Sequence, residues 1–227
     1  MIERVPEREA MDSAQDANDY DMMDHSSVNA AFADDLIQAA SRRGCSPFRE
    51  CVVIDVGTGT ARIPIALCRR ARPWKVLGVD LAHEMLMVGK KNVEAAGLRM
   101  GVTLQRGSAT ALPFADGRCE LLTSNSLIHH LPAPAEALRD LCRVASPGGL
   151  IFVRDLLRPE SESAIEDLVL TYADSAPAGQ RNLFAASLKA AFTMGEMRDM
   201  IEALPFAEAS LEASSDRHWT LAAVRAR

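Results

Sequence analysis

The stretch CVVIDVGTGTA, residues 51–61, decides the fold of this 227-residue chain. Its first half is a short apolar run rich in β-branched residues, which is typical of a strand buried on both faces. The amphipathic run Arg62–Arg70 follows directly and has the spacing of a helix. Gly57 and Gly59 let the backbone turn tightly and approach a ligand closely. The stretch therefore predicts a strand, a glycine-rich turn and a helix, with a ligand at the end of the strand.

Strands and helices alternate along the chain after this turn. Short apolar runs predict further buried strands, and the runs between them predict helices. The strands are expected at 76–79, 102–104, 121–124 and 150–153, and the helices at about 61–71, 82–96 and 134–145. Such alternation specifies right-handed crossovers and a mainly parallel sheet. We expect an α/β, Rossmann-like three-layer sandwich that binds its ligand beyond the carboxyl ends of the strands.

The C-terminal third of the chain changes this rhythm. Apolar residues at helical spacing predict a helical insert at about 160–203, which should cover the ligand edge of the sheet. The runs 206–211 and 218–224 are separated by a polar stretch and predict an antiparallel hairpin that closes the sheet. We assign residues 46–227 to one ligand-binding domain that contains this insert.

The N-terminal part of the chain is strongly acidic. Residues 1–35 hold ten acids against two arginines, a net charge of −8, whereas the whole chain sums to −6. A solvated tail over residues 1–19 is one interpretation, and a folded acidic arm or a surface for a cationic partner is the other. Ser26 or Ser27 is expected to cap the helix that follows. We assign the acidic segment and this cap helix to residues 1–45.

Composition indicates an ordinary globular protein, with 48% hydrophobic and 25% charged residues. No apolar run approaches the roughly 20 residues that a membrane helix needs, and the charged start does not resemble a secretory signal. We therefore expect a cytoplasmic protein without a membrane span. Five cysteines without a C-x-x-C pair argue against disulfides and structural zinc, so no metal is expected. The sequence contains no cluster of Lys and Arg residues, so nucleic acid is not expected as a partner. The sequence does not indicate the oligomeric state.

The acids around the turn favour a cationic ligand over a dinucleotide. The second predicted strand ends in Asp80, 25 residues after Asp55, where a carboxylate can accept hydrogen bonds from ribose hydroxyls. Dinucleotide sites usually read G-x-G-x-x-G, whereas this turn reads G-T-G-T-A directly after Asp55 and Val56. A carboxylate at that position would repel a pyrophosphate, but it would not repel a sulfonium or an ammonium group.

Four motifs within about residues 50–158 resemble the class I superfamily of S-adenosylmethionine (AdoMet) dependent methyltransferases, of the UbiE/methyltransferase-domain type. They are VIDVGTGTARIPIAL, VLGVDLAHEML, GSATALPFADGRCELLTSNSLIHHL and PGGLIFVRD, in the order of the superfamily. The resemblance implies a seven-stranded sheet, AdoMet as cofactor, S-adenosylhomocysteine as product, and methyl transfer as the reaction.

The same resemblance implies a set of cofactor-binding residues. They are Asp55, Gly57, Thr58 and Gly59 at the methionine tail, Asp80 at the ribose, Leu81, Met85, Ser108 and Ala109 around the adenine, and Asn125 beside the methionine moiety. Ser108 departs from the pattern, because an acidic residue usually stands at the adenine edge. Met85 is equally well explained by helix packing.

Polar residues after the fourth and fifth strands are candidates for the acceptor side. Methyl transfer mainly needs alignment and exclusion of water, so a base is not obligatory. If the acceptor must lose a proton, the candidate catalytic residues are His129, His130 and Asp155. The alternatives are a structural role for a histidine and an ion pair of Asp155 with a neighbouring arginine. Candidates for the substrate side or for a lid are Tyr20, His25, Arg158, Arg181 and His218.

We expect a methyltransferase with a small-molecule acceptor, because the insert and an N-terminal lid would close the site. An RNA or protein methyltransferase is the second possibility, although enzymes that methylate base amines often carry an Asn/Asp-Pro-Pro-Tyr signature where this chain reads SNSL at 124–127. A non-catalytic AdoMet-binding protein is the third. The acceptor atom is not indicated by the sequence.

Overall fold

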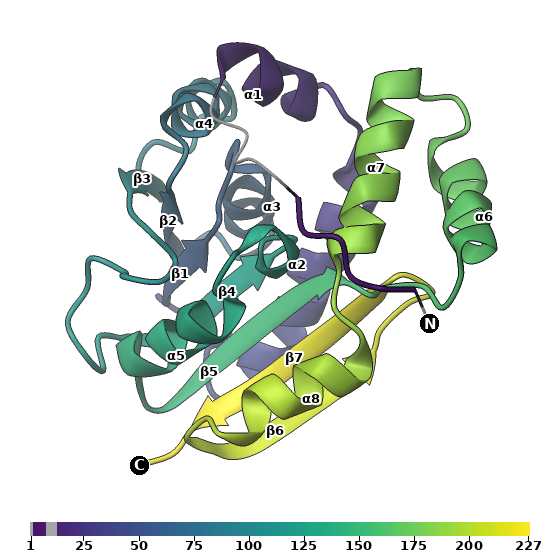
Figure 1. The fold of residues 1–227 in the computed structure, drawn as a ribbon. Coiled ribbons are helices and arrows are strands. Elements are labelled where there is room, and N and C mark those ends of the chain that lie inside the picture. Colours follow the sequence, from purple (N-terminus) through teal and green to yellow (C-terminus); the bar gives the residue numbers. More distant parts are fainter. Residues whose placement is uncertain (1, 8–12) are drawn as a thin grey trace.

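A computed structural model describes residues 2–7 and 13–227 of the chain. One seven-stranded sheet has the strand order β3-β2-β1-β4-β5-β7-β6, with β7 antiparallel to β5 and β6 and the remaining pairs parallel (Figure 1). The strands are β1 (Val52–Val56), β2 (Lys75–Asp80), β3 (Val102–Arg106), β4 (Cys119–Asn125), β5 (Ala145–Leu156), β6 (Phe206–Ala213) and β7 (His218–Arg225). The helices are α1 (Ala14–Asp21), α2 (Ser26–Ser41), α3 (Arg62–Arg70), α4 (His83–Ala95), the short η1 (Ile128–His130), α5 (Pro134–Val144), α6 (Glu162–Ala173), α7 (Ala178–Ala190) and α8 (Met194–Glu202).

Helices cover both faces of this sheet, and each face has its own hydrophobic core. α2 and α3 pack on one face, where Phe32 and Leu67 are buried together with Val53 of β1. α5 and α8 pack on the other, where Leu141 is buried together with Ile54 of β1. Because neighbouring side chains of a strand point to opposite faces, β1 is buried on both sides. The expected Rossmann-like three-layer sandwich is confirmed.

The helices after β5 lie at two different places on the sheet. α6 and α7 stand beyond the carboxyl end of β5, whereas α8 lies along the face of the sheet near β6 (Figure 1). Met197 of α8 is fully buried in the second core, and a capping box of Thr193 and Glu196 starts the helix. The predicted insert is therefore helical throughout, but its last helix belongs to the core rather than to a cover over the ligand edge. The predicted C-terminal hairpin is formed by β6 and β7.

The acidic N-terminal segment is folded over part of its length, which removes the solvated tail as a description of residues 13–19. Ser13 caps α1, and Ala17 is buried against α4. The predicted serine cap of α2 is wrong: His25 is the N-cap residue without a side-chain bond, and Asp24 instead accepts a hydrogen bond of 2.9 Å from the N–H of Ser26. A carboxylate suits this place because the helix N-terminus carries partial positive charge.

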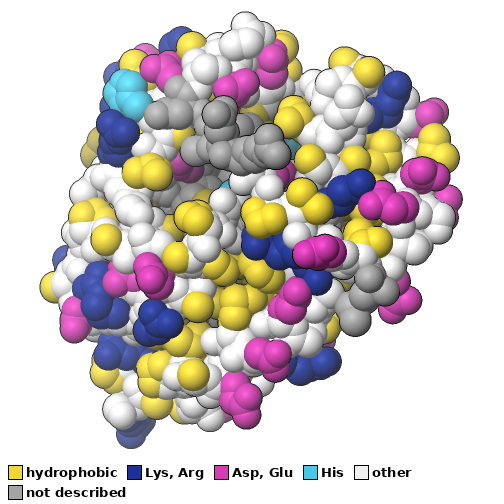
Figure 2. All heavy atoms as spheres, viewed as in Figure 1, with side chains coloured by type: hydrophobic (Ala, Val, Ile, Leu, Met, Phe, Trp, Pro, Cys, Tyr) yellow, Lys and Arg dark blue, Asp and Glu magenta, His cyan; other side chains and the backbone are white. Residues whose placement is uncertain are grey.

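Among the residues that are described, no helix is both long and apolar enough to cross a bilayer. Acidic and basic side chains are interspersed on the face seen in Figure 2. Four of the five cysteines are buried, as expected for small core residues, and Cys45 is half-buried.

Candidate active site

The turn between β1 and α3 takes its shape from left-handed backbone at Gly57 and Gly59. Their φ angles are +76° and +52°, in the region that favours glycine. A Cβ on Gly57 would lie 2.8 Å from the side chain of Leu127, so that position has no room for a side chain. The N–H groups of Gly57 and Thr58 donate to the carbonyl of Val79 at 2.8 and 3.0 Å. The turn is thereby fixed against the end of β2.

Asp80 ends β2 with its carboxylate on the same turn. Oδ2 accepts a hydrogen bond of 2.7 Å from the N–H of Gly59, and Oδ1 accepts one of 2.9 Å from the N–H of Ala82 at the start of α4. Burial raises the pKa of Asp80. Each carboxylate oxygen can accept two hydrogen bonds, so holding the turn leaves capacity for ribose hydroxyls.

Buried oxygens without a hydrogen-bond partner gather around this turn. In the described part of the chain they are Asp55 Oδ2, Thr58 Oγ1, Thr60 Oγ1 and Asn125 Oδ1. Thr58, Thr60 and Asn125 line a cavity of about 330 Å³, a size suited to a small ligand. A buried polar group without a partner costs about 1–3 kcal/mol. The unpaired oxygens therefore indicate a polar ligand that donates hydrogen bonds, and they fit the ammonium and ribose groups of AdoMet.

Asp55 is the most deeply buried acid of this group, with 1% of its surface exposed. Burial, together with the neighbouring charge of Asp80, raises the pKa of Asp55 to about 7. A carboxyl group with such a pKa is poised to ionise when a cation arrives. The sequence placed Asp55 at the ammonium side of the cofactor, and its burial and unpaired oxygen support that prediction.

Residues of the N-terminal segment line the other side of the cavity, from Tyr20 to Ser26. The ring of Tyr20 lies 4.0 Å from the place where a Cβ on Gly59 would stand, and its centroid is 5.5 Å from that of His25. The predicted lid residues Tyr20 and His25 thus both lie at the cofactor turn.

Asp21 fastens this segment to the body of the protein. Its carboxylate accepts hydrogen bonds from Arg62 Nε at 2.9 Å and from Arg62 Nη2 at 2.7 Å. The amide of Asn92 on α4 donates to Asp21 at 2.9 Å and to the carbonyl of Thr60 at 3.0 Å. Asp21 thereby connects α1, α3, α4 and the cofactor turn, a role that the sequence analysis missed because its partners lie 41 and 71 residues away.

The candidate catalytic residues His129 and Asp155 form a buried pair. His129 Nδ1 lies 2.5 Å from Asp155 Oδ1, and the N–H of His129 donates to Asp155 Oδ2 at 3.2 Å. Burial alone would lower the pKa of His129, but the charge and hydrogen bond of Asp155 together with the charge of Glu7 outweigh it, and the net shift is upward. The expected alternative, an arginine partner for Asp155, is not what the structure shows: the neighbouring Arg154 instead binds Asp35 and Thr220.

His130 lies beside this pair and meets a residue that the sequence analysis missed. The ring centroids of His129 and His130 are 3.9 Å apart. His130 Nδ1 lies 2.5 Å from Glu7 Oε2, and Ser187 of α7 donates to Glu7 Oε1 at 2.6 Å. Glu7, His129, His130 and Asp155 are called the acceptor-side cluster below. A glutamate in an acidic segment carries no local signal that it will meet a histidine 123 residues away.

Three of the predicted substrate-side residues have local structural partners and do not line the described cavity. Arg158 donates to the carbonyl of Ala191 and to Glu196. Arg181 donates to backbone carbonyls in the turn between α6 and α7. Burial and the neighbouring arginines lower the pKa of His218 to about 4, and its Nδ1 is 2.8 Å from Ser215 Oγ. A substrate role for these three remains a prediction.

Of the four residues predicted around the adenine, Leu81, Ser108 and Ala109 lie in loops, and Met85 lies in the first turn of α4. Leu81 is 55% exposed directly after Asp80, and Met85 packs in the contact between α1 and α4. Ser108 Oγ is 2.9 Å from Thr110 Oγ1 in the loop after β3, and Ala109 is half-buried next to it. These positions surround the edge where Asp80 ends β2, but their contact with a cofactor stays a prediction.

Known proteins share both the motifs and the fold of this chain. A model of the methyltransferase domain family matches residues 54–153. A demethylmenaquinone methyltransferase of Bacteroides fragilis is 31% identical over 114 residues, which are 50% of this chain and 46% of that protein. The ubiquinone/menaquinone biosynthesis C-methyltransferase UbiE of Roseobacter denitrificans is 32% identical over 157 residues, 67% of this chain and 62% of the relative. The chain thus spans about half to three fifths of the length of these relatives.

Solved structures agree in fold over nearly the whole chain. A SAM-dependent methyltransferase from Aquifex aeolicus superposes with a TM-score of 0.63 at 18% identity, covering 93% of this chain and 98% of its own. A Methanococcus maripaludis protein assigned to the same class reaches 0.70 at 16% identity, with 98% of both chains covered. Residues 54–153 are therefore similar to the methyltransferase domain family, and nearly the whole chain shares the fold of solved SAM-dependent methyltransferases.

Proposed function

We propose that this chain is an AdoMet-dependent methyltransferase that acts on a small-molecule acceptor. The observation that carries the proposal is the set of unpaired buried oxygens at the ends of β1 and β4, next to the acids Asp55 and Asp80. AdoMet supplies an electrophilic methyl group on a sulfonium. Asp55 would bind the ammonium group and Asp80 the ribose, so that the cofactor is fixed at both ends.

The segments that border the site support a small acceptor. The N-terminal segment borders the cofactor cavity, and residues 2–7 run between α7 and η1 on the acceptor side. The two curated relatives named above carry names that describe methylation of quinones, which are small molecules. An RNA or protein acceptor is less favoured, because basic side chains on the face of Figure 2 are interspersed with acidic ones.

The acceptor-side cluster would handle a proton where the reaction releases one. Asp155 engages Nδ1 of His129 and thereby leaves Nε2 as the ring nitrogen that can take a proton from the acceptor. His130 stands directly beside it. We also expect the protein to act in the cytoplasm, as the sequence suggests.

The proposal is tested by titrating the purified chain with AdoMet in a calorimeter and then supplying acceptors, beginning with demethylmenaquinone analogues. Binding at micromolar AdoMet followed by formation of S-adenosylhomocysteine supports the proposal. Absence of AdoMet binding by the folded chain would overturn it, and binding without turnover across a broad acceptor panel would favour a non-catalytic AdoMet-binding protein.

A further inference from the structure

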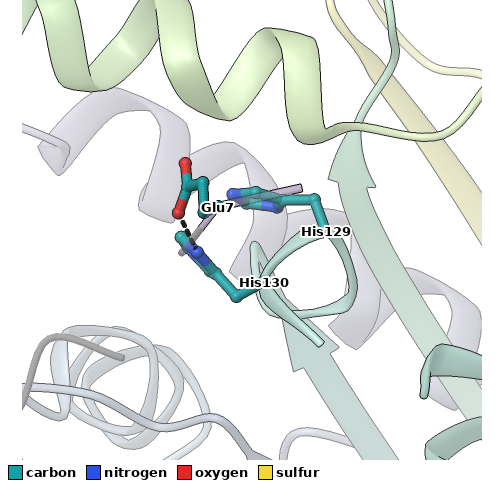
Figure 3. A group of neighbouring side chains, drawn as sticks. All are labelled: Glu7, His129 and His130. Atoms are coloured by element: carbon teal, nitrogen blue, oxygen red, sulfur yellow. Dashed lines mark ion pairs between the residues drawn. The ribbon is translucent and has the colours of Figure 1, made fainter. Parts of the chain in front are cut away.

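Three side chains of the acceptor-side cluster face one another as metal ligands do. The ligand atoms of Glu7, His129 and His130 all lie within 4.8 Å of one another. Figure 3 shows the two rings and the carboxylate pointing into one small space, with Glu7 arriving from the N-terminal segment and both histidines from η1. Glu7 is more than 120 residues away from the two adjacent histidines in the chain, and nothing in the cofactor site uses these three residues.

The donor set matches one chemical class of cation. Two imidazole nitrogens and one carboxylate oxygen suit divalent first-row transition metals such as Zn²⁺, Mn²⁺, Fe²⁺ or Co²⁺ and leave coordination positions open. Mg²⁺ and Ca²⁺ are disfavoured because they prefer sites made of oxygen ligands.

Asp155 supplies the supporting contact that such a site needs. A histidine that binds a metal usually donates its other ring N–H to a carboxylate, which fixes the ring and strengthens it as a ligand. His129 does this through Nδ1, at 2.5 Å from Asp155 Oδ1, while Asp155 is further held by the N–H groups of His129 and Leu156. The ring of His129 is therefore oriented before any ligand binds, with Nε2 as its coordinating atom.

The charges around the cluster also favour a cation. Glu7 and Asp155 bring two carboxylates to two imidazoles in a space that is largely shielded from solvent. The nearby cation Arg4 directs its hydrogen bonds at the carbonyls of Ala190 and His129, at 2.6 and 3.0 Å, and packs over the ring of Phe192.

We propose that Glu7, His129 and His130 bind one divalent transition-metal ion, with Asp155 as the supporting carboxylate. In combination with the proposed function, on which this second step rests, the ion lies on the acceptor side and offers its open positions to an acceptor oxygen, such as that of a phenol or hydroxyquinone. With the ion bound, Nε2 of His129 is a ligand and no longer a base, and the ion instead makes the bound hydroxyl group more acidic. The N-terminal segment then completes the metal site, because it brings Glu7.

The test uses the full chain after treatment with a chelator, titrated with Co²⁺ and separately with Zn²⁺ in the absence of AdoMet. We expect one equivalent to bind, with visible Co²⁺ absorption bands that Zn²⁺ removes. Glu7→Gln and His130→Gln should each weaken binding at least tenfold, and Asp155→Asn should weaken it by about 10- to 100-fold. His83→Gln, at the start of α4, is the matched control and should leave binding unchanged.

His129 is buried, so replacing it can prevent folding. Glu7 lies at the edge of the fold, so Glu7→Gln should fold and its metal binding can be compared directly with that of the original chain. Absence of stoichiometric metal binding, or binding that Glu7→Gln leaves intact in a chain with unaltered circular dichroism, would overturn the metal site. AdoMet binding by the metal-free chain is measured separately, so failure of the metal site and failure of the proposed function give different results.

Discussion

The cofactor half and the acceptor half of the site are built in opposite ways. In the cofactor half, Asp55, Gly57, Gly59 and Asp80 come from one strand-turn-helix unit and the strand after it, within 26 residues of sequence. In the acceptor half, Glu7 meets His130 and Ser187 across 123 and 180 residues. The difference teaches that the predicted cofactor residues come from one local unit of the fold, whereas the acceptor-side cluster also needs Glu7 from the N-terminal segment and Ser187 from α7.

If the two halves are separate in this sense, Asp155→Ala should damage stability far more than cofactor binding. The variant leaves the buried His129 without its charge partner, and breaking a buried pair costs about 3–5 kcal/mol. Urea unfolding of the metal-free protein measures this loss, and calorimetry should show an AdoMet affinity within about threefold of the original. The matched control is Asp34→Ala, which breaks the exposed pair with Arg70 and should change unfolding far less. A large fall in AdoMet affinity with intact stability would show that the halves are coupled.

Asp80→Ala tests the cofactor half directly. Loss of a charged acceptor for the ribose should weaken AdoMet binding by about 1–3 kcal/mol, roughly five- to 150-fold. Part of that effect comes from the turn, because Asp80 also accepts the N–H of Gly59. Asp80→Asn keeps one acceptor oxygen, so its affinity for AdoMet should lie between those of the original protein and of the alanine variant. An unchanged affinity in the alanine variant would remove Asp80 from the cofactor site.

The same contrast explains what the sequence could predict. The run at 51–61 indicates a strand, a turn and the start of a helix through its local pattern. The sheet and the positions of Asp55 and Asp80 at its strand ends could therefore be predicted from the sequence. Glu7 and Asp21 act through partners far away in the chain, and an acidic segment gives no local signal for either. Arg158 was predicted at the substrate side, yet its Nη2 binds Glu196 at 2.7 Å, because the packing of α8 beside it could not be read from the sequence.

The titration of Asp55 offers a finer test of the cofactor half. Its folded pKa of about 7 is raised above the ordinary value of 3.8, so the stability that this group contributes is present below pH 4 and lost as the pH rises through 7. Binding of an ammonium group favours the ionised form of Asp55, so the affinity for AdoMet increases with pH whereas the stability contribution of Asp55 decreases. AdoMet affinity should therefore rise about tenfold between pH 6 and pH 8. Asp55→Asn should bind more weakly and lose this dependence, and an identical pH profile in both proteins would separate Asp55 from the cofactor.

The smallest effect is expected where the N-terminal segment joins the cofactor half. Asp21→Ala removes the ion pair with Arg62 and the hydrogen bond from the Asn92 amide. The Asn92 amide keeps its hydrogen bond to the carbonyl of Thr60. Since Arg62 is half-exposed, the pair contributes only about 0.2–1 kcal/mol, and AdoMet should dissociate about two- to fivefold faster in stopped-flow measurements. Asp19→Ala is the control, because Asp19 bonds only to Gln15 within α1 in the described structure. Equal dissociation rates in the two variants would mean that the N-terminal segment borders the cofactor without retaining it, and its role would then lie entirely with Glu7 on the acceptor side.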